Sequence, residues 1–249
     1  MPDLLYGRNA VREALRAGRR SFERLLVSSG AQEAGTLGEV VRLAEKVGVP
    51  IERVDRHELD RRLREANHQG VALECGEYSY VDLEDCLAMA EERGEPALLL
   101  MLDHLQDPQN VGTLLRTAEA VGAHGVVMPG RRAAEVTPAV VNASSGATEH
   151  LRIAVVGNLA QSIAEVQKAG VWVVGIEDDE RAHTYDRADL DMPLALVVGA
   201  EGSGLARLTR ERCDFLVRLP MRGQITSLNA AVAGSIVLYH AWRVRRPNT

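Results

Sequence analysis

The sequence predicts an α/β fold in two parts, a small N-terminal region and a larger C-terminal region built on a parallel sheet. From Ala97 onward, short apolar runs alternate with helical patterns, which is typical of βαβ units. The N-terminal region alternates in the same way, with shorter elements. A charged helical stretch separates the two. We therefore expect domains at 1–75 and 96–249, joined by a linker at 76–95.

The N-terminal region begins with a helix, in which Val11, Ala14 and Leu15 mark one apolar face. Strand-like segments are then expected at 24–28, 50–54 and 69–75, with helical patterns at 37–47 and 57–63. Gly48 is a natural stop for the second helix. This order predicts a small α/β sandwich.

The C-terminal region opens with a continuous apolar run at 98–102, as expected for a strand buried on both faces. A helix with one apolar face follows it. Further short strands are expected at 126–128, 153–156, 171–176, 194–198 and 215–219. A final helix runs through Leu228, Val232, Ile236 and Tyr239. The predicted architecture is a parallel sheet with helices on both faces.

Composition indicates a compact protein without a membrane segment. Apolar residues make up 46% of the chain, yet no apolar run reaches the roughly 18 residues that a transmembrane helix needs. The first residues lack the pattern of a secretory signal. Cys75, Cys86 and Cys213 form no C-x-x-C pair and suit buried thiols in a reducing compartment. We expect a soluble, cytoplasmic protein with no membrane partner.

The net charge of −6 argues against a general nucleic-acid coat protein, which is usually strongly basic. A local basic face is nevertheless enough to meet phosphates. Candidate phosphate contacts form two clusters, namely Arg16, Arg19, Arg20 and Arg24, and the pair Arg131 and Arg132. The seven histidines are scattered without metal-ligand spacing, so no metal site is expected. His104 and His150 are expected to have structural roles.

Three loops of the C-terminal region carry unusual chemistry, and the first spans 103–116. Asp107-Pro108 makes the chain leave its strand extended. Asn110 stands where a helix N-cap would be, and Arg116 lies about one and a half turns into the helix. One interpretation is an ordinary cap and a solvated arginine. The other is functional, because an amide can bond a ribose hydroxyl and a guanidinium can grip a phosphate.

The second loop, Gly199-Ala200-Glu201-Gly202-Ser203-Gly204, follows a late strand, and its glycines let backbone approach a ligand closely. The spacing is not G-x-G-x-x-G, which argues against a nicotinamide-dependent oxidoreductase. It is not G-x-S-x-G either, which argues against a hydrolase nucleophile elbow.

The third loop joins Pro220-Met221-Arg222-Gly223 to Ser227-Leu228-Asn229 at the start of the final helix. A purely structural interpretation makes Ser227 the N-cap of that helix.

Taken together, the three loops resemble the signature motifs of the SpoU-type branch of the SPOUT RNA methyltransferases. Asn110-Val111-Gly112 with Arg116 is similar to the first motif. The loop 199–204 is similar to the second, and Pro220-Met221 with Ser227-Leu228-Asn229 to the third. The N-terminal region, with Tyr6-Gly7 and His68-Gln69-Gly70-Val71, resembles the ribosomal-protein-like RNA-binding domain of one subfamily. That subfamily methylates the 2′-hydroxyl of a guanosine in large-subunit (23S) ribosomal RNA. The stretch 142–147 matches a family loop only loosely.

The resemblance implies a deep trefoil knot at the C-terminal end, from about Leu194, and S-adenosylmethionine as the cofactor. It also implies a homodimer, with the final helix as a reasonable dimer face. The cofactor pocket would be lined by Gly199, Leu219, Met221 and Leu228, and a turn at Gly175 would close over it.

The resemblance also implies the catalytic residues. Asn110 and Asn229 would orient the ribose and the loop, and Ser227 would fix the third loop. Arg116 would clamp the RNA phosphate and the reacting hydroxyl, held by Glu201. A sulfonium methyl is already activated, so the protein must mainly align it with the attacking oxygen. An arginine pKa above about 12 makes Arg116 a clamp first and a base second.

Two alternatives stay open. One is a transfer-RNA 2′-O-ribose methyltransferase of the same branch, against which the N-terminal region argues. The other is a non-catalytic RNA-binding module. The presence of Asn110, Arg116, Glu201 and Asn229 argues against that module.

Overall fold

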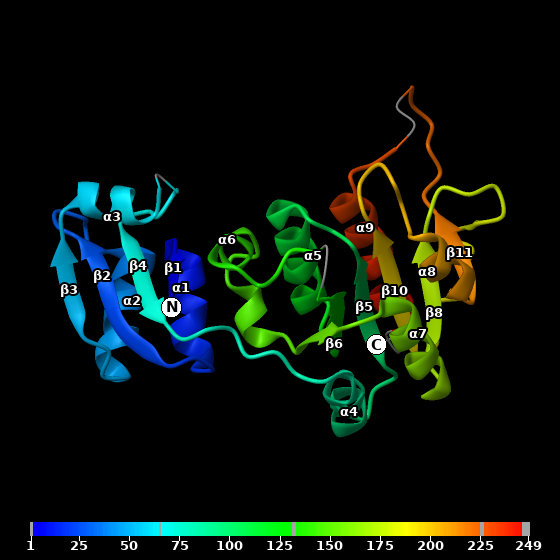
Figure 1. Cartoon of the computed structure of the whole chain (residues 1–249), viewed down its shortest axis with the longest axis horizontal. Coiled ribbons are helices and arrows are strands. Elements are labelled where there is room, and N and C mark those ends of the chain that lie inside the picture. The colour runs from blue at the N-terminus through cyan, green and yellow to red at the C-terminus, as the bar shows by residue number, and fades with distance from the viewer. Residues whose placement is uncertain (1, 65, 131–132, 225–226, 246–249) are drawn as a thin grey trace. The chain divides into compact units, whose positions relative to one another are not determined.

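The computed structural model describes residues 2–64, 66–130, 133–224 and 227–245. The chain divides into two compact units, each with its own sheet (Figure 1). The first unit is Met1–Ser79 with Val136–His150, and the second is Tyr80–Glu135 with Leu151–Thr249. The prediction of an α/β fold with a parallel C-terminal sheet is confirmed.

The first unit contains a four-stranded mixed sheet in the order β1-β4-β2-β3. Its strands are β1 (Asp3–Tyr6), β2 (Phe22–Ser28), β3 (Ile51–Val54) and β4 (Val71–Cys75), and its helices are α1 (Arg8–Ala17), α2 (Gly35–Lys46) and α3 (Arg56–Arg62). Strand β1 was not predicted, because it is four residues long and its sequence shows no alternation. It is stabilised by antiparallel pairing with β4, where Leu5 lies opposite Leu73.

Two short helices from far along the chain, α6 (Pro138–Ala143) and η1 (Ala147–His150), complete the first unit. Asn142 Nδ2 donates a hydrogen bond to the Tyr6 carbonyl at 2.9 Å. A Cβ on Gly146 would stand 2.7 Å from Glu13 Cβ, so only glycine permits this approach of η1 to α1. The predicted boundary at 96–249 had placed this segment with the C-terminal region. The segment 136–150 joins the first unit through contacts with residues far away in the sequence, and the local sequence pattern does not predict such contacts.

A buried ion pair joins the N-terminal residues to this segment. Arg20 donates from Nε and Nη2 to the two carboxylate oxygens of Glu149 at 3.0 and 2.8 Å, and from Nη1 to Asp3 at 2.8 Å. The side chains of Arg20 and Glu149 are each 1% exposed. The guanidinium also lies 5.1 Å from the centre of the Tyr78 ring.

Ion pairing bears on the prediction that the first basic cluster contacts RNA phosphates. The expectation that Arg20 contacts RNA phosphate is wrong, because its guanidinium is buried and neutralised. Arg16 pairs with Glu13 and Glu39, and Arg24 pairs with Glu52 and Glu74. The second cluster, Arg131 and Arg132, lies outside the described residues.

The second unit contains a seven-stranded sheet in the order β7-β6-β5-β10-β8-β11-β9, and every pair in it is parallel. Its strands are β5 (Leu98–Asp103), β6 (Gly125–Pro129), β7 (Ile153–Val156), β8 (Trp172–Ile176), β9 (His183–Thr184), β10 (Leu194–Gly199) and β11 (Phe215–Arg218). The strands at the centre are apolar and buried on both faces, as predicted for β5.

Helices cover both faces of this sheet (Figure 1). One face packs against α4 (Leu83–Arg93) and α7 (Leu159–Lys168), and α7 in turn contacts α8 (Arg207–Arg212). The other packs against α9 (Ala230–Val244), which lies beside α5 (Pro108–Ala120). Successive residues of β10 face opposite sides, since Val197 joins the core under α7 while Val198 lies close to Gly234 of α9.

The predicted linker contributes to the core of the second unit. Val81 forms a parallel β-bridge with Ala154 of β7, and Leu83, Cys86 and Ala90 of α4 are buried. Burial raises the pKa of the Cys86 thiol to about 11, so it stays protonated at neutral pH. Cys75 and Cys86 are buried as expected, whereas Cys213 is partly exposed.

Among the described residues, no helix is long and apolar enough to cross a membrane, and no group of three or more potential metal ligands gathers. The trefoil knot rests on the family resemblance and stays a prediction.

The Arg20–Glu149 pair generates a stability prediction. In Glu149→Gln the guanidinium of Arg20 loses its fully buried carboxylate partner and keeps only the partly exposed Asp3, which costs about 3 kcal/mol. We expect the free energy of unfolding, measured by urea denaturation with circular dichroism, to fall by about that amount. The exposed pair between Arg53 and Glu33 supplies the control, because Glu33→Gln should change stability by less than about 1 kcal/mol. Equal effects of the two substitutions would contradict the assignment.

Candidate active site

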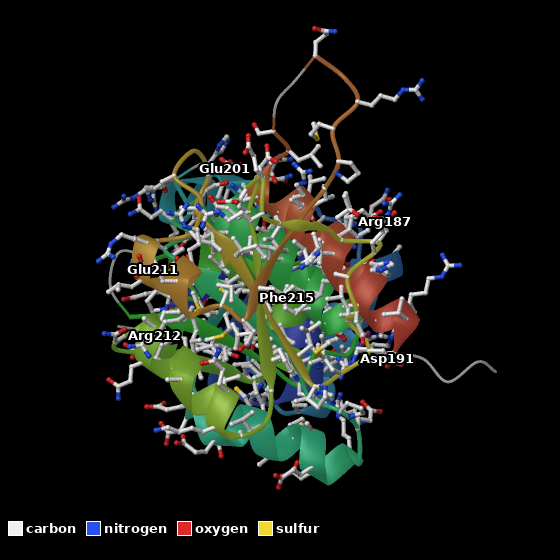
Figure 2. The ribbon with its side chains drawn as sticks, turned by 90° about the vertical axis from the view of Figure 1, so that its right-hand side faces the viewer. Arg187, Asp191, Glu201, Glu211, Arg212 and Phe215 are labelled. Carbon is white, nitrogen blue, oxygen red and sulfur yellow. The ribbon has the colours of Figure 1, made fainter. Side chains whose placement is uncertain are left out.

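The strands at the centre of the second sheet bring their carboxyl ends to one edge. In the register, Gly199 of β10 lies beside Asp103 of β5, and Val198 lies beside Ile176 of β8. Figure 2 shows Glu201 at this edge, while Asp191, which precedes β10, lies toward the opposite end. Ligands of parallel α/β sheets gather at this edge, so the three unusual loops meet where a site is expected.

One amide group joins the three loops. Asn229 Nδ2 donates to Asn110 Oδ1 at 2.8 Å and also to Glu201 Oε1. Asn229 Oδ1 accepts from the backbone N–H groups of Ala231 and Val232, at 2.9 and 3.1 Å. Asn110, Glu201 and Asn229, which the resemblance names as catalytic residues, thus lie together within one chain. We call these three residues the amide junction.

These contacts correct both predicted helix caps. Asp107, not Asn110, is the N-cap of α5, and its carboxylate accepts from the N–H of Gln109 and of Asn110. Asn229, not Ser227, is the N-cap of α9. Asp, Asn and Ser are similarly favourable as N-cap residues. Residue preference alone therefore could not identify which of several nearby polar residues caps each helix. The correction leaves the Asn110 amide pointing to the site.

Glycines close the second loop tightly. Ala200 and Gly204 exchange backbone hydrogen bonds at 3.1 and 2.9 Å, which folds 200–204 back on itself. A Cβ on Gly199 would stand 2.3 Å from the Gly204 carbonyl carbon, and one on Gly204 would stand 2.5 Å from a Glu177 carboxylate oxygen. Glu177 also accepts from the Leu205 N–H at 2.9 Å.

A cavity of about 510 Å³ lies between the second and third loops and the end of β8. Four of the five residues predicted to bind the cofactor line this cavity, namely Gly199, Leu219, Met221 and Leu228. Three of the predicted catalytic residues, Glu201, Ser227 and Asn229, line it as well. We call it the knot-side cavity, because the predicted knot would lie on this side of the second loop. Met221 and Leu228 are 40% and 41% exposed, so they offer apolar surface to a ligand.

The fifth residue, Gly175, behaves differently. It lies inside β8 and not in a turn, so the predicted turn is wrong. A Cβ there would stand 2.7 Å from side-chain carbons of Leu205 and Leu216, so glycine is required by packing beneath the loop. The residues after it, Ile176 and Glu177, line the knot-side cavity instead.

Sequence reasoning missed three charged residues of this cavity, Glu177, Asp178 and Arg218. All three follow or end a strand of the parallel sheet, β8 or β11, and that position was the available signal. Arg218 is notable because its buried Nε has no hydrogen-bond partner among the described residues.

A second cavity of about 570 Å³ adjoins the first, and we call it the β5-side cavity. Its lining includes Asp103, His104, Asp107, Asn110 and Ser203. Ala200, Glu201 and Gly204 line both cavities, so the second loop is their common wall.

Arg116 lies on the exposed side of α5 and lines neither cavity. Within the described chain Glu201 accepts a hydrogen bond from Asn229. The predicted role of Glu201 in holding Arg116 therefore stays a prediction.

Comparison with known proteins agrees with this geometry. Residues 97–239 match the SpoU rRNA Methylase family, and residues 4–81 match the domain described as RNA 2′-O ribose methyltransferase substrate binding. The chain belongs to the SpoU rRNA methylase family. It is an S-adenosylmethionine-dependent RNA methyltransferase of the TrmH/SpoU type.

Relatives of full length support the assignment. A Bacillus subtilis protein, YacO, whose name places it in the TrmH family of tRNA/rRNA methyltransferases, is 43% identical over 98% of this chain and 97% of its own. The SpoU methyltransferase AviRb of Streptomyces viridochromogenes, solved with AdoMet, is 27% identical, covers 97% of this chain and 90% of its own, and has a TM-score of 0.79. An rRNA methyltransferase of Sinorhizobium meliloti is 26% identical, covers 99% and 88%, and has a TM-score of 0.78.

One tRNA-modifying relative of known structure matches a smaller part of this chain. The A. aeolicus TrmH/SpoU tRNA modifying enzyme is 27% identical and has a TM-score of 0.55. It covers 61% of this chain and 76% of its own.

The knot-side cavity fits S-adenosylmethionine. Its volume lies within the roughly 300–1,000 Å³ of ligand pockets. Met221 and Leu228 supply apolar surface, Glu177 and Asp178 supply charge opposite to a sulfonium, and Arg218 supplies charge opposite to a carboxylate. When bound, the cofactor supplies an electrophilic methyl group. The chain's own residues bind and orient it and hold the acceptor nearby.

The amide junction generates the next prediction. In Asn229→Ser a hydroxyl can still cap α9, but the amide donor to Asn110 and Glu201 is lost. We expect thermal stability close to that of the parent chain and a methyl-transfer rate lower by about 100-fold. Asn229→Ala is the matched variant, because it also loses the cap and should be less stable by about 1 kcal/mol. A serine variant with full transfer activity would exclude a catalytic part for the junction.

Proposed function

We propose that this chain transfers a methyl group from S-adenosylmethionine to the ribose 2′-hydroxyl of a guanosine in 23S ribosomal RNA. The choice of ribosomal RNA rests on how much of this chain each solved relative covers. The S. meliloti rRNA methyltransferase matches nearly the whole chain, whereas the A. aeolicus tRNA modifying enzyme matches 61% of it. The substrate-binding match at 4–81 supports ribose as the methylated group. The choice of guanosine rests on the resemblance of the N-terminal region to one subfamily.

In this proposal the catalytic residues have distinct tasks. Asn110 uses its remaining amide donor on a ribose oxygen, since its Oδ1 already accepts from Asn229. Glu201 and Asn229 hold that amide in place, and Ser227 fixes the third loop beside the knot-side cavity. Arg116 clamps the RNA phosphate with planar donors.

We further propose a homodimer formed through α9. Val232, Ile236 and Tyr239 are 45%, 37% and 47% exposed, and their spacing places them on one side of the helix. The opposite side of α9 is buried in the second unit through residues such as Gly234, Val237 and Leu238. This exposed apolar face begins at Val232, three residues after the N-cap Asn229, so a second copy packed on it would lie next to the site.

The substrate proposal is tested with methyl-labelled S-adenosylmethionine and either unmodified 23S ribosomal RNA or transfer RNA. We expect label in 23S RNA, as a single 2′-O-methylguanosine located by nuclease digestion and mass spectrometry. Label confined to transfer RNA would favour the alternative substrate. RNA binding without any label would favour a non-catalytic module.

Arg116→Ala is the control for chemistry at the proposed site. It should abolish transfer while calorimetry shows unchanged cofactor affinity, because Arg116 does not line the knot-side cavity. A loss of cofactor affinity would contradict the assigned role.

The dimer is tested by sedimentation velocity at micromolar concentration. The parent chain should have twice the 27.1 kDa mass of one chain, and Ile236→Glu should sediment as one chain. Burial of an unpaired carboxylate at the interface is the reason for dissociation. Leu208→Glu on α8 is the matched control, since Leu208 is also exposed, at 53%, and should leave the mass unchanged. A monomeric parent chain would refute the proposal.

A further inference from the structure

His104, at the carboxyl end of β5, is held by a fully buried carboxylate. Its Nδ1 lies 2.5 Å from Asp103 Oδ1, and Asp103 Oδ2 accepts from the Ala206 N–H at 2.7 Å. Asp103 is 0% exposed, whereas the His104 side chain is 41% exposed. Both oxygens of Asp103 are thus engaged, and the imidazole is anchored on one nitrogen while it reaches solvent.

The anchoring selects one form of the ring. A carboxylate offers only acceptors, so Nδ1 carries the hydrogen and, in the neutral ring, Nε2 keeps its lone pair. Nε2 forms no hydrogen bond with any described residue. This is the arrangement of a general base whose orientation is set by a carboxylate.

The imidazole lines the β5-side cavity together with Asn110 and Glu201. This cavity shares the wall formed by Ala200, Glu201 and Gly204 with the knot-side cavity that fits the cofactor. An acceptor in the β5-side cavity and a donor in the knot-side cavity would therefore both lie against Glu201 of the amide junction.

We propose that the β5-side cavity receives the acceptor ribose and that His104 Nε2 takes the proton of the reacting hydroxyl. This rests on the proposed ribose methylation. The bond between O2′ and the methyl carbon forms as the bond between that carbon and sulfur breaks. Sulfur keeps the electron pair and becomes a thioether, and the hydroxyl proton goes to Nε2, which gives an imidazolium paired with Asp103.

The charges around the ring suit this task. The titratable groups that line the cavity with His104 are the carboxyl groups of Asp103, Asp107 and Glu201. They favour the imidazolium that forms when the proton arrives. No lysine or arginine of the described chain lines this cavity, which therefore suits a neutral ribose better than a phosphate.

The test uses the full chain with 23S ribosomal RNA in single turnover. His104→Gly and His104→Asn suit the left-handed backbone at this position, φ 58°, so folding should be preserved. We expect transfer rates lower by about 10²- to 10⁴-fold, with unchanged cofactor affinity by calorimetry. Added imidazole should restore part of the rate to His104→Gly, because it can fill the vacated space and accept the proton.

Two further readouts separate a base from a structural histidine. The parent rate should fall as the pH is lowered, because a protonated base cannot accept the hydroxyl proton, and His104→Asn should lack that acidic limb. Nitrogen-15 NMR of the protein without RNA should show the hydrogen of His104 on Nδ1. His183→Asn in β9 is the control and should leave both rate and pH profile unchanged.

Several results would overturn the inference: full activity of His104→Gly, an acidic limb that persists in His104→Asn, absence of imidazole rescue, or a hydrogen on Nε2 of the neutral ring. Failure of the proposed function looks different, because the parent chain itself would then form no 2′-O-methyl product.

Discussion

The amide of Asn229 is the constraint on which the site depends. Its carbonyl oxygen caps α9 through two backbone N–H groups, while its nitrogen donates to Asn110 and to Glu201. One side chain thereby couples the start of the last helix to the loops that follow β5 and β10. The coupling is orientational, because a planar amide presents donor and acceptor in fixed directions. Packing of α9 against α5 and β10 then sets where the junction stands.

The loop 200–204 places the amide junction at the border of two cavities. Its tight fold allows no Cβ on Gly199 or Gly204, and its residues line two cavities of similar volume. The knot-side cavity combines apolar surface with charges that complement the ends of S-adenosylmethionine, and the β5-side cavity combines amide, carboxylate and imidazole groups. Methyl transfer needs a donor and an acceptor that are aligned more than it needs a strong catalyst, because the sulfonium is already reactive. Glu201 lines both cavities and is therefore placed near both the donor and the acceptor in the proposed reaction.

The first unit is organised around a different principle. A buried pair of Arg20 and Glu149 and the close approach of Gly146 to Glu13 bind the segment 136–150 to the N-terminal sheet. Each charge is satisfied by several hydrogen bonds, as burial of an ion pair requires. A substrate-binding unit that includes a segment from within the methyltransferase sequence is connected to the second unit at three points of the chain, not one.

The sequence by itself determined the α/β class, most elements and the three loops, because apolar periodicity and glycine or proline signals are local properties. It did not determine that β1 pairs with β4, that Gly175 is a packing position, or that Asp107 and Asn229 are the caps. Nor did it reveal Arg218, Glu177 or the partner of Arg20. These are decided by contacts between residues far apart in the chain, and the free energy of such contacts depends on burial and on distance in space. Local patterns carry neither quantity, so only the tertiary structure could decide them.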